Sequence, residues 1–179
     1  MPDFKKHLQN PNVKKYCIIG GAGLLAIIAI IVAIFLLFPG PETVTKNIMK
    51  GIINGDGEAV VKYLLPTNWG YDDDQKDYIV SKIENISDNM DRGDKITYKI
   101  LRVQDLTKSE IQSLKDYNLS IYENRYEEFN MDDITDYKKV KIKMNLTSDY
   151  LDRETITREI ILVKYKGQWK LLRIESLIY

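Results

Sequence analysis

Few side chains of this 179-residue chain can carry nucleophilic, acid–base or metal chemistry. The only histidine is His7 and the only cysteine is Cys17, both near the N-terminus. The rest of the chain therefore lacks the imidazole of a histidine-based triad and the cysteine and histidine ligands of a zinc site. A lone cysteine also excludes an intramolecular disulfide. We predict no catalytic residue, no cofactor and no metal site.

Two runs of like charge are further candidates for a functional site. Asp72, Asp73 and Asp74 precede a predicted helix, where acidic side chains favour the helix dipole. A calcium loop would need alternating oxygen ligands and a downstream bidentate acid, and that pattern is absent. Lys139, Lys141 and Lys143 alternate along a predicted strand. Such a ladder is typical of a solvent-facing surface and also protects sheet edges from pairing.

An uninterrupted apolar segment covers residues 18–38 and contains no charged or hydroxyl side chain. At about 1.5 Å per residue it spans the roughly 30 Å core of a bilayer, which predicts a transmembrane helix. Four lysines precede the segment and an uncharged FPGP turn follows it. Positive residues stay on the cytoplasmic side, so we expect a cytoplasmic N-terminus and an extracellular C-terminal domain. A cleaved signal peptide is the alternative, but the run is long and no small-residue cleavage pair follows it.

The predicted domains are a cytoplasmic tail (1–17), the transmembrane helix (18–38), a linker (39–41) and one extracytoplasmic domain (42–179). Four lysines and one aspartate lie in residues 1–39, which leaves 22 basic and 25 acidic residues and a formal charge of −3. Nucleic-acid binding requires a clustered basic face, and this balance does not indicate one. We therefore predict no nucleic-acid partner.

Hydrophobic periodicity predicts three helices after the linker. The first begins near Glu42 and ends at the NGDG turn of residues 54–57, the second stops before Pro66, and the third covers about residues 75–90. The apolar positions of the three are Val44, Ile48, Met49, Ile52, Ile53; Ala59, Val60, Tyr63, Leu64; and Ile79, Ile83, Ile86, Met90. Further on, Thr107 and Glu110 have the spacing of a capping box and predict a short fourth helix.

Alternating side chains predict four strands. The first covers residues 96–103 and is apolar on both faces, which places it near the centre of the sheet. The next strand, residues 139–146, is expected to bury Val140, Ile142, Met144 and Leu146 and to expose the lysine ladder to solvent. Residues 155–165 and a segment from Trp169 complete an antiparallel meander, joined by a tight turn at Lys166–Gln168. Residues 119–134 are interpreted as a helical turn leading into a loop. Helices followed by an antiparallel sheet of about four strands give an α+β fold.

This order of elements, ending in GQWKLLRI, resembles the nuclear transport factor two-like superfamily, whose domains are also called cystatin-like cones. The segment TVTKNIMKGIINGDGEAVVKYL is similar to the opening of its bacterial envelope members, and residues 166–170 resemble their final hairpin. The resemblance implies a cone-shaped domain with three N-terminal helices on a curved antiparallel sheet. Membrane-anchored or lipoprotein domains of Gram-positive bacteria share this topology. The VirB-type bitopic component of type IV secretion shares it as well.

The resemblance implies two kinds of function. The first is a non-catalytic binding or assembly domain of a single-pass protein, a component of the cell envelope or of a conjugation or secretion complex. Its partners would be the membrane, other envelope proteins or a second copy of the chain. The alternative is a small-molecule-binding or isomerase-like enzyme, since such members keep an acid inside the cone. Tyr98, Tyr165 and Trp169 would then line the cavity, and Glu159 or Glu175 would project into it.

Overall fold

The computed structural model describes residues 39–66, 73–90, 93–120, 123, 129–148, 154–174 and 177. The chain divides into two compact units, residues 1–38 and 39–179, and every described residue belongs to the second. The predicted cytoplasmic tail and transmembrane helix therefore lie outside the described residues. Within the described ranges, no helix is long and apolar enough to cross a membrane.

Three helices open the described domain, as predicted. Helix α3 (Pro41–Asn54) ends at Gly55, whose φ of 66° provides the left-handed C-cap. Helix α4 (Gly57–Val61) is shorter than predicted and begins where the Asp56 side chain accepts the Ala59 N–H. Helix α5 covers Asp73–Asp88. A Cβ added at Gly57 would lie 2.7 Å from the Cα of Val80, so this glycine allows α4 and α5 to pack backbone against backbone.

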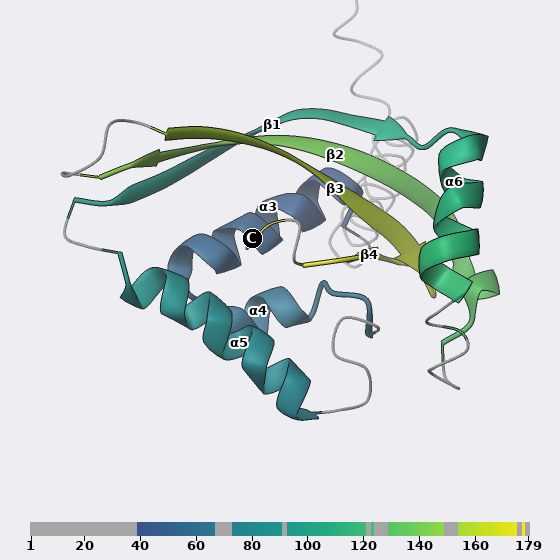
Figure 1. Ribbon diagram of the computed structural model, residues 1–179, viewed down its shortest axis with the longest axis horizontal. Helices are drawn as coiled ribbons and strands as arrows, with labels where there is room; N and C mark the ends of the chain where they lie inside the picture. The colour runs from purple at the N-terminus through teal and green to yellow at the C-terminus, as the bar shows by residue number, and fades with distance from the viewer. Residues whose placement is uncertain are drawn as a thin grey trace, which may run out of the picture. The chain divides into compact units, whose positions relative to one another are not determined.

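The sheet contains four antiparallel strands in the order β1-β2-β3-β4. They are β1 (Lys95–Asp105), β2 (Ile134–Thr147), β3 (Glu154–Tyr165) and β4 (Gln168–Leu171), and the strands arch over α3 (Figure 1). Lys166 and Gly167, with φ of 47° and 79°, form the tight turn between β3 and β4. The α+β prediction with helices packed on a four-stranded sheet is confirmed.

Residues 63–65 hold β4 on the side away from β3. Leu64 forms a parallel bridge with Leu171. The Leu171 N–H donates to the Tyr63 carbonyl at 2.7 Å, and the Leu65 N–H donates to the Leu171 carbonyl at 2.9 Å. The Lys170 ammonium also donates to the Lys62 carbonyl at 2.6 Å, across 108 residues of sequence. The short last strand is therefore held by the segment that follows α4.

The predicted central position of the first strand is wrong, because β1 lies at one end of the strand order. The register of β1 against β2 shifts between Ile100 and Arg102, which indicates a β-bulge. Leu101 at this bulge is 45% exposed. An extra residue in the strand moves the following side chains to the opposite faces, which explains why apolar residues occupy both alternating positions of this edge strand.

A short helix, α6 (Lys108–Leu114), follows β1 at the end of the sheet (Figure 1). It continues into a π-helical turn, η2 (Lys115–Leu119), and a 3₁₀ turn, η3 (Met131–Asp133), precedes β2. Residues 121, 122 and 124–128 of the segment predicted as a helical turn and loop lie outside the described residues, and η3 occupies the part of it where a loop was predicted. Strand β2 begins at Ile134, five residues before the predicted strand.

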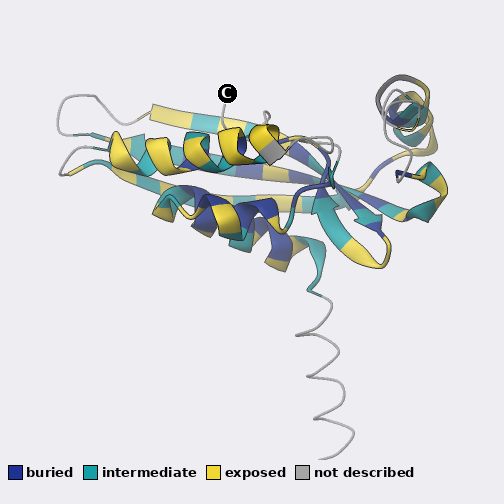
Figure 2. Ribbon diagram, turned by 90° about the horizontal axis from the view of Figure 1, so that it is seen from below, coloured by how far each residue is buried: buried dark blue, intermediate teal, exposed yellow. Residues whose placement is uncertain are grey.

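Two hydrophobic cores lie on opposite faces of the sheet. Side chains of Val140, Ile142 and Met144 point to α3 and α4, and the residues between them point to the other face. What we call the inner core consists of Val44, Ile48, Met49, Ile52, Val60, Val61, Leu64, Ile79, Ile83, Val140, Ile142, Met144, Ile160, Leu162, Leu171, Ile174 and Leu177. Figure 2 shows how buried and exposed positions alternate along the helices that cover it.

The outer core covers only one end of the opposite face. It consists of Leu65, Leu106, Leu114, Leu119, Phe129, Ile134, Tyr137, Val163, Tyr165 and Leu172. Tyr137 and Val163 are register partners on β2 and β3, and Leu114 belongs to α6. The Phe129 and Tyr165 rings stack with centroids 5.5 Å apart. The remainder of the outer face carries charged and polar side chains.

Candidate binding groove beside helix α6

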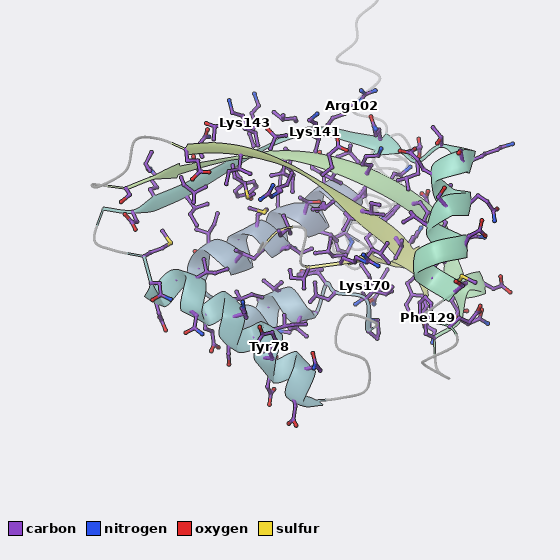
Figure 3. The ribbon with its side chains drawn as sticks, viewed as in Figure 1. Tyr78, Arg102, Phe129, Lys141, Lys143 and Lys170 are labelled. Carbon is purple, nitrogen blue, oxygen red and sulfur yellow. The ribbon has the colours of Figure 1, made fainter. Side chains whose placement is uncertain are left out.

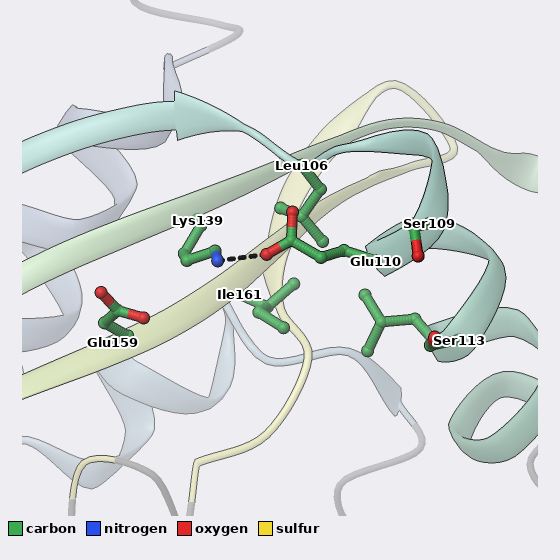
Figure 4. A pocket seen from close by; sticks show the side chains of 8 residues that line it. Leu106, Ser109, Glu110, Ser113, Lys139, Glu159 and Ile161 are labelled. Carbon is green, nitrogen blue, oxygen red and sulfur yellow. Dashed lines mark hydrogen bonds and ion pairs between the residues drawn. The ribbon is translucent and has the colours of Figure 1, made fainter.

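A hollow of about 610 Å³ lies between α6 and the outer face of β2 and β3 (Figure 4). This volume falls within the range of small-molecule sites, roughly 300–1,000 Å³. We call this hollow the α6 groove. Its lining residues are Leu106, Ser109, Glu110, Ser113, Leu114, Lys139, Glu159 and Ile161.

A capping box fixes the start of α6 and places Glu110 in the groove. The Glu110 N–H donates to the Thr107 hydroxyl at 3.3 Å. The Thr107 N–H and hydroxyl each lie 2.8 Å from Glu110 Oε2, to which they donate. These reciprocal bonds satisfy free N–H groups of the first turn. Glu110 Oε1 is left to accept a hydrogen bond from the Lys139 ammonium (Figure 4).

Glu110 and Lys139 form an ion pair between α6 and β2. The hydrogen bond from Lys139, followed by those from Thr107, lowers the pKa of Glu110 to about 2. The same pairing raises the pKa of Lys139 above its ordinary value. Both groups therefore stay charged near neutral pH. Proton transfer is most efficient when a pKa lies near the operating pH, so this pair suits fixed-charge recognition.

The bottom of the α6 groove is apolar. Leu106 and Leu114 belong to the outer core, and Ile161 packs against it. Ser109 and Ser113 add hydroxyl groups from α6. The groove thus combines an apolar surface, two hydroxyls and a fixed ion pair, which is the mixture expected of a specific binding site.

A smaller hollow of about 110 Å³ continues from the α6 groove along the outer face. It is lined by Arg102, Gln104, Lys139, Lys141 and Glu159, and it shares Lys139 and Glu159 with the larger one. Lys141 and Glu159 are register partners on β2 and β3, with Nζ and Oε1 3.6 Å apart. Both side chains are about half exposed. The two hollows are therefore neighbours on the outer face.

The aromatic residues predicted to line a cone cavity do not lie together. Tyr98 and Trp169 pack at the margin of the inner core, whereas Tyr165 belongs to the outer core. The Tyr98 hydroxyl donates to the Lys46 carbonyl at 3.4 Å. None of the three lines either hollow.

The two predicted acids have different outcomes. Glu159 lines both hollows, but it lies on the outer face, opposite to the face covered by α3. Glu175 lies outside the described residues.

Glu110 and Lys139 were each visible in the sequence, one as a capping residue and the other as part of the lysine ladder. Their pairing was not predicted, because 29 residues separate them and α6 must fold back over the sheet to join them. The same is true of the apolar side chains of the groove. No group of histidine, cysteine or acidic residues suited to a metal ion occurs in the described part of the chain.

Comparisons with known proteins establish no family for this chain. No protein family matches it, and no curated protein does. Among solved structures it is similar to a Campylobacter jejuni protein provisionally named an NTF2-like transpeptidase, at 18% sequence identity and a TM-score of 0.35. The match covers 74% of this chain and 97% of that one. A TM-score this low does not establish a shared fold, and the superfamily resemblance stays a prediction.

Proposed function

We propose that this protein is a membrane-anchored, non-catalytic binding protein whose extracytoplasmic domain takes its ligand or partner in the α6 groove. The observation that carries the proposal is the groove itself, which has a volume of about 610 Å³. It has an apolar floor, and the Glu110–Lys139 ion pair lies at its edge. Apolar area supplies affinity in such sites, while a few placed polar groups supply orientation.

Binding is favoured over catalysis by the charges in the groove. With its pKa lowered to about 2, the Glu110 carboxyl is a weak base and carries no proton to donate near pH 7. The space beneath the other face of the sheet is filled by aliphatic side chains, among them Ile48, Ile142 and Leu162, each 0% exposed. An isomerase-like site needs an acid in an apolar cavity, and these positions offer none.

The membrane part of the proposal rests on the sequence. Residues 18–38 would anchor the protein, with the basic tail in the cytoplasm and the domain outside. A role in a Gram-positive envelope or a secretion complex, and a nuclear transport factor two-like cone, belong to the same proposal. A partner protein would use the groove rather than a flat apolar face. The large hydrophobic residues that are exposed within the described ranges, Tyr78 and Leu101, belong to separate elements.

The anchor is tested by membrane extraction of the full-length protein. We expect it to stay with the membrane in alkaline carbonate and to be released by detergent, and a variant lacking residues 18–38 should stay in the soluble fraction. Protease added to intact cells should digest the domain and spare the tail. Release of the full-length protein by carbonate would contradict the anchor.

The groove is tested by photo-crosslinking in the native membrane. A photoreactive amino acid at Ser113, which lines the groove, should give an adduct of defined mass, and the same group at Tyr78 on α5 should not. Ser109→Trp fills the groove from α6 and should abolish the adduct. Ser81→Trp, at an exposed serine of α5, is the matched control and should preserve it. An adduct that persists in Ser109→Trp, or none above the Tyr78 level, would overturn the proposal.

A further inference from the structure

The outer face beyond the α6 groove carries four cationic side chains in two neighbouring rows. Lys99 of β1 is the register partner of Lys143 on β2, and Arg102 is the partner of Lys141. Figure 3 shows Arg102, Lys141 and Lys143 on the side of the sheet away from α3 and α5. We call these four residues the cationic strip.

The strip is electrostatically costly to the fold. Like charges directly opposite each other in an antiparallel pair destabilise a sheet, and here two such pairs adjoin. Within the described part of the chain, the strip forms one ion pair, between Lys141 and Glu159. The sequence after residue 39 has a formal charge of −3, so the strip opposes the sign of its own domain. An anionic ligand would remove this repulsion.

We propose that the cationic strip binds a linear polyanion with negative groups about 7 Å apart, namely a polyol phosphodiester. This inference rests on the proposed function, because the strip continues the α6 groove through the hollow shared at Lys139 and Glu159. Residues two apart on an antiparallel strand, such as Lys141 and Lys143, are about 6.8 Å apart. Three backbone bonds span about 3.5 Å, so the six-bond repeat of a glycerol phosphate chain spans about 7 Å.

The polar side chains beyond the strip fit the same ligand. Thr97, Asn145 and Thr155 form the next row across β1, β2 and β3, and Thr157 is the partner of Lys143. The Thr155 hydroxyl donates to Asn145 Oδ1 at 2.9 Å. Hydroxyl and amide groups in this row can exchange hydrogen bonds with the hydroxyls of a polyol.

Two other polyanions fit less well. Single-stranded nucleic acid is held by aromatic platforms as well as by charge, and no aromatic residue occurs in the rows of the strip or of Thr97. A protein interface needs apolar or aromatic anchors at its centre, and the strip offers charged and hydroxyl groups instead. A phosphodiester chain needs neither bases nor anchors, since its affinity comes from charge neutralisation.

The test uses the full-length protein in nanodiscs of uncharged lipid and a fluorescent glycerol phosphate oligomer. Binding is followed by anisotropy at several salt concentrations. The double variant Lys99→Gln/Lys143→Gln removes two charges of the strip. Its matched control, Lys50→Gln/Lys62→Gln, removes two exposed lysines of the α3–α4 region. Inorganic phosphate and poly-glutamate are the comparison ligands.

We expect the wild-type protein to bind the oligomer with an affinity that falls with salt, with a log–log slope of roughly −1.4 for the two phosphates that the two rows of the strip can hold. Each lysine removed should weaken binding about fivefold, so the strip variant should lose roughly 25-fold and half of the slope. The control variant should bind within about twofold of wild type, and inorganic phosphate should compete poorly.

Three results would overturn the polyanion proposal: no binding at low salt, equal losses in the two double variants, or tighter binding of poly-glutamate than of the oligomer. Tighter binding of poly-glutamate would indicate that the strip binds an acidic protein segment instead. The α6 groove is tested separately by the Ser113 adduct and Ser109→Trp. If the strip fails these tests but the Ser113 adduct still forms, the polyanion proposal is wrong and the proposed binding function of the α6 groove is kept.

Discussion

The two faces of the sheet are built from the same strands but serve different purposes. The inner core is formed by aliphatic residues and methionine, and it packs against the three helices α3, α4 and α5. The outer core is smaller, includes Phe129, Tyr137 and Tyr165, and borders the groove. It is covered by a helix of seven residues and a π-helical turn.

This difference indicates where the stability of the domain is concentrated and where the proposed ligand would bind. Local opening occurs where few apolar contacts hold an element, which predicts that α6 opens more easily than α3. The proposed binding groove lies beside this short helix and could adjust to a ligand, while the inner core keeps the strands in register. The following variants test this contrast, from the largest expected effect to the smallest.

Leu162→Ala should unfold the domain most readily. Leu162 is 0% exposed in the inner core, and truncation of a fully buried leucine costs about 3 kcal/mol or more. Urea unfolding followed by circular dichroism should show one cooperative transition at a lower midpoint. A loss below about 1 kcal/mol would show that the inner core is not the main source of stability.

Val163→Ala and Val140→Ala form a matched pair on the two faces. Both valines are 0% exposed, Val163 in the outer core and Val140 in the inner core. Each truncation should cost about 2 kcal/mol. Amide hydrogen exchange should become faster in α6 alone for Val163→Ala and across the sheet and α3 for Val140→Ala. Identical exchange patterns would mean that the two cores open as one unit.

Tyr137→Phe should leave the stability unchanged or raise it by up to about 1 kcal/mol. Tyr137 is 6% exposed, and its hydroxyl is buried with no hydrogen-bond partner among the described residues, so removing the hydroxyl recovers its desolvation cost. Burial accordingly raises the pKa of Tyr137. Tyr165→Phe is the contrast, because a side-chain hydrogen bond with Tyr165 raises the pKa of Lys166 and the phenylalanine would lose that bond, so a thermal melt should show this variant less stable. Destabilisation by Tyr137→Phe would reveal a hydrogen bond to water or ligand.

Glu110→Gln should have the smallest effect, a small loss of stability near neutral pH that disappears in acid. Hydrogen bonds lower the folded pKa of Glu110 from 4.5 to about 2, so its stabilising effect is complete above about pH 4.5 and disappears as the pH falls towards 2. The variant should therefore lose less stability than wild type between about pH 4.5 and about pH 2. Thermal melts at a series of pH values would measure this difference. Glu84→Gln, at an exposed position of α5, is the control. Its stability should fall in acid by as much as that of wild type.

Local signals in the sequence predicted most of the elements. The NGDG turn marked the end of α3, the Thr107–Glu110 spacing marked the start of α6, and alternation marked β2 and β3. Each of these signals depends on residues a few positions apart, which is why they were readable. The edge position of β1 was missed, because the bulge at Leu101 mimics a strand buried on both faces.

The candidate site was not predictable in the same way. Alternation shows which side chains share a face of β2, but not that α6 covers Tyr137 and leaves Lys141 open. The formal charge of −3 likewise concealed four cations on one surface. Net charge sums over the whole domain, whereas the cross-strand register decides which charges become neighbours.

The hydrogen bonds between residues 63–65 and β4 have a consequence for the order in which the chain folds. Because Lys170 and Lys62 are 108 residues apart, the chain cannot close this part of the sheet until β4 has emerged. Contacts so distant in sequence form late and slowly. During translation α3 and α4 therefore stay without their contacts to β4 until that strand has been made.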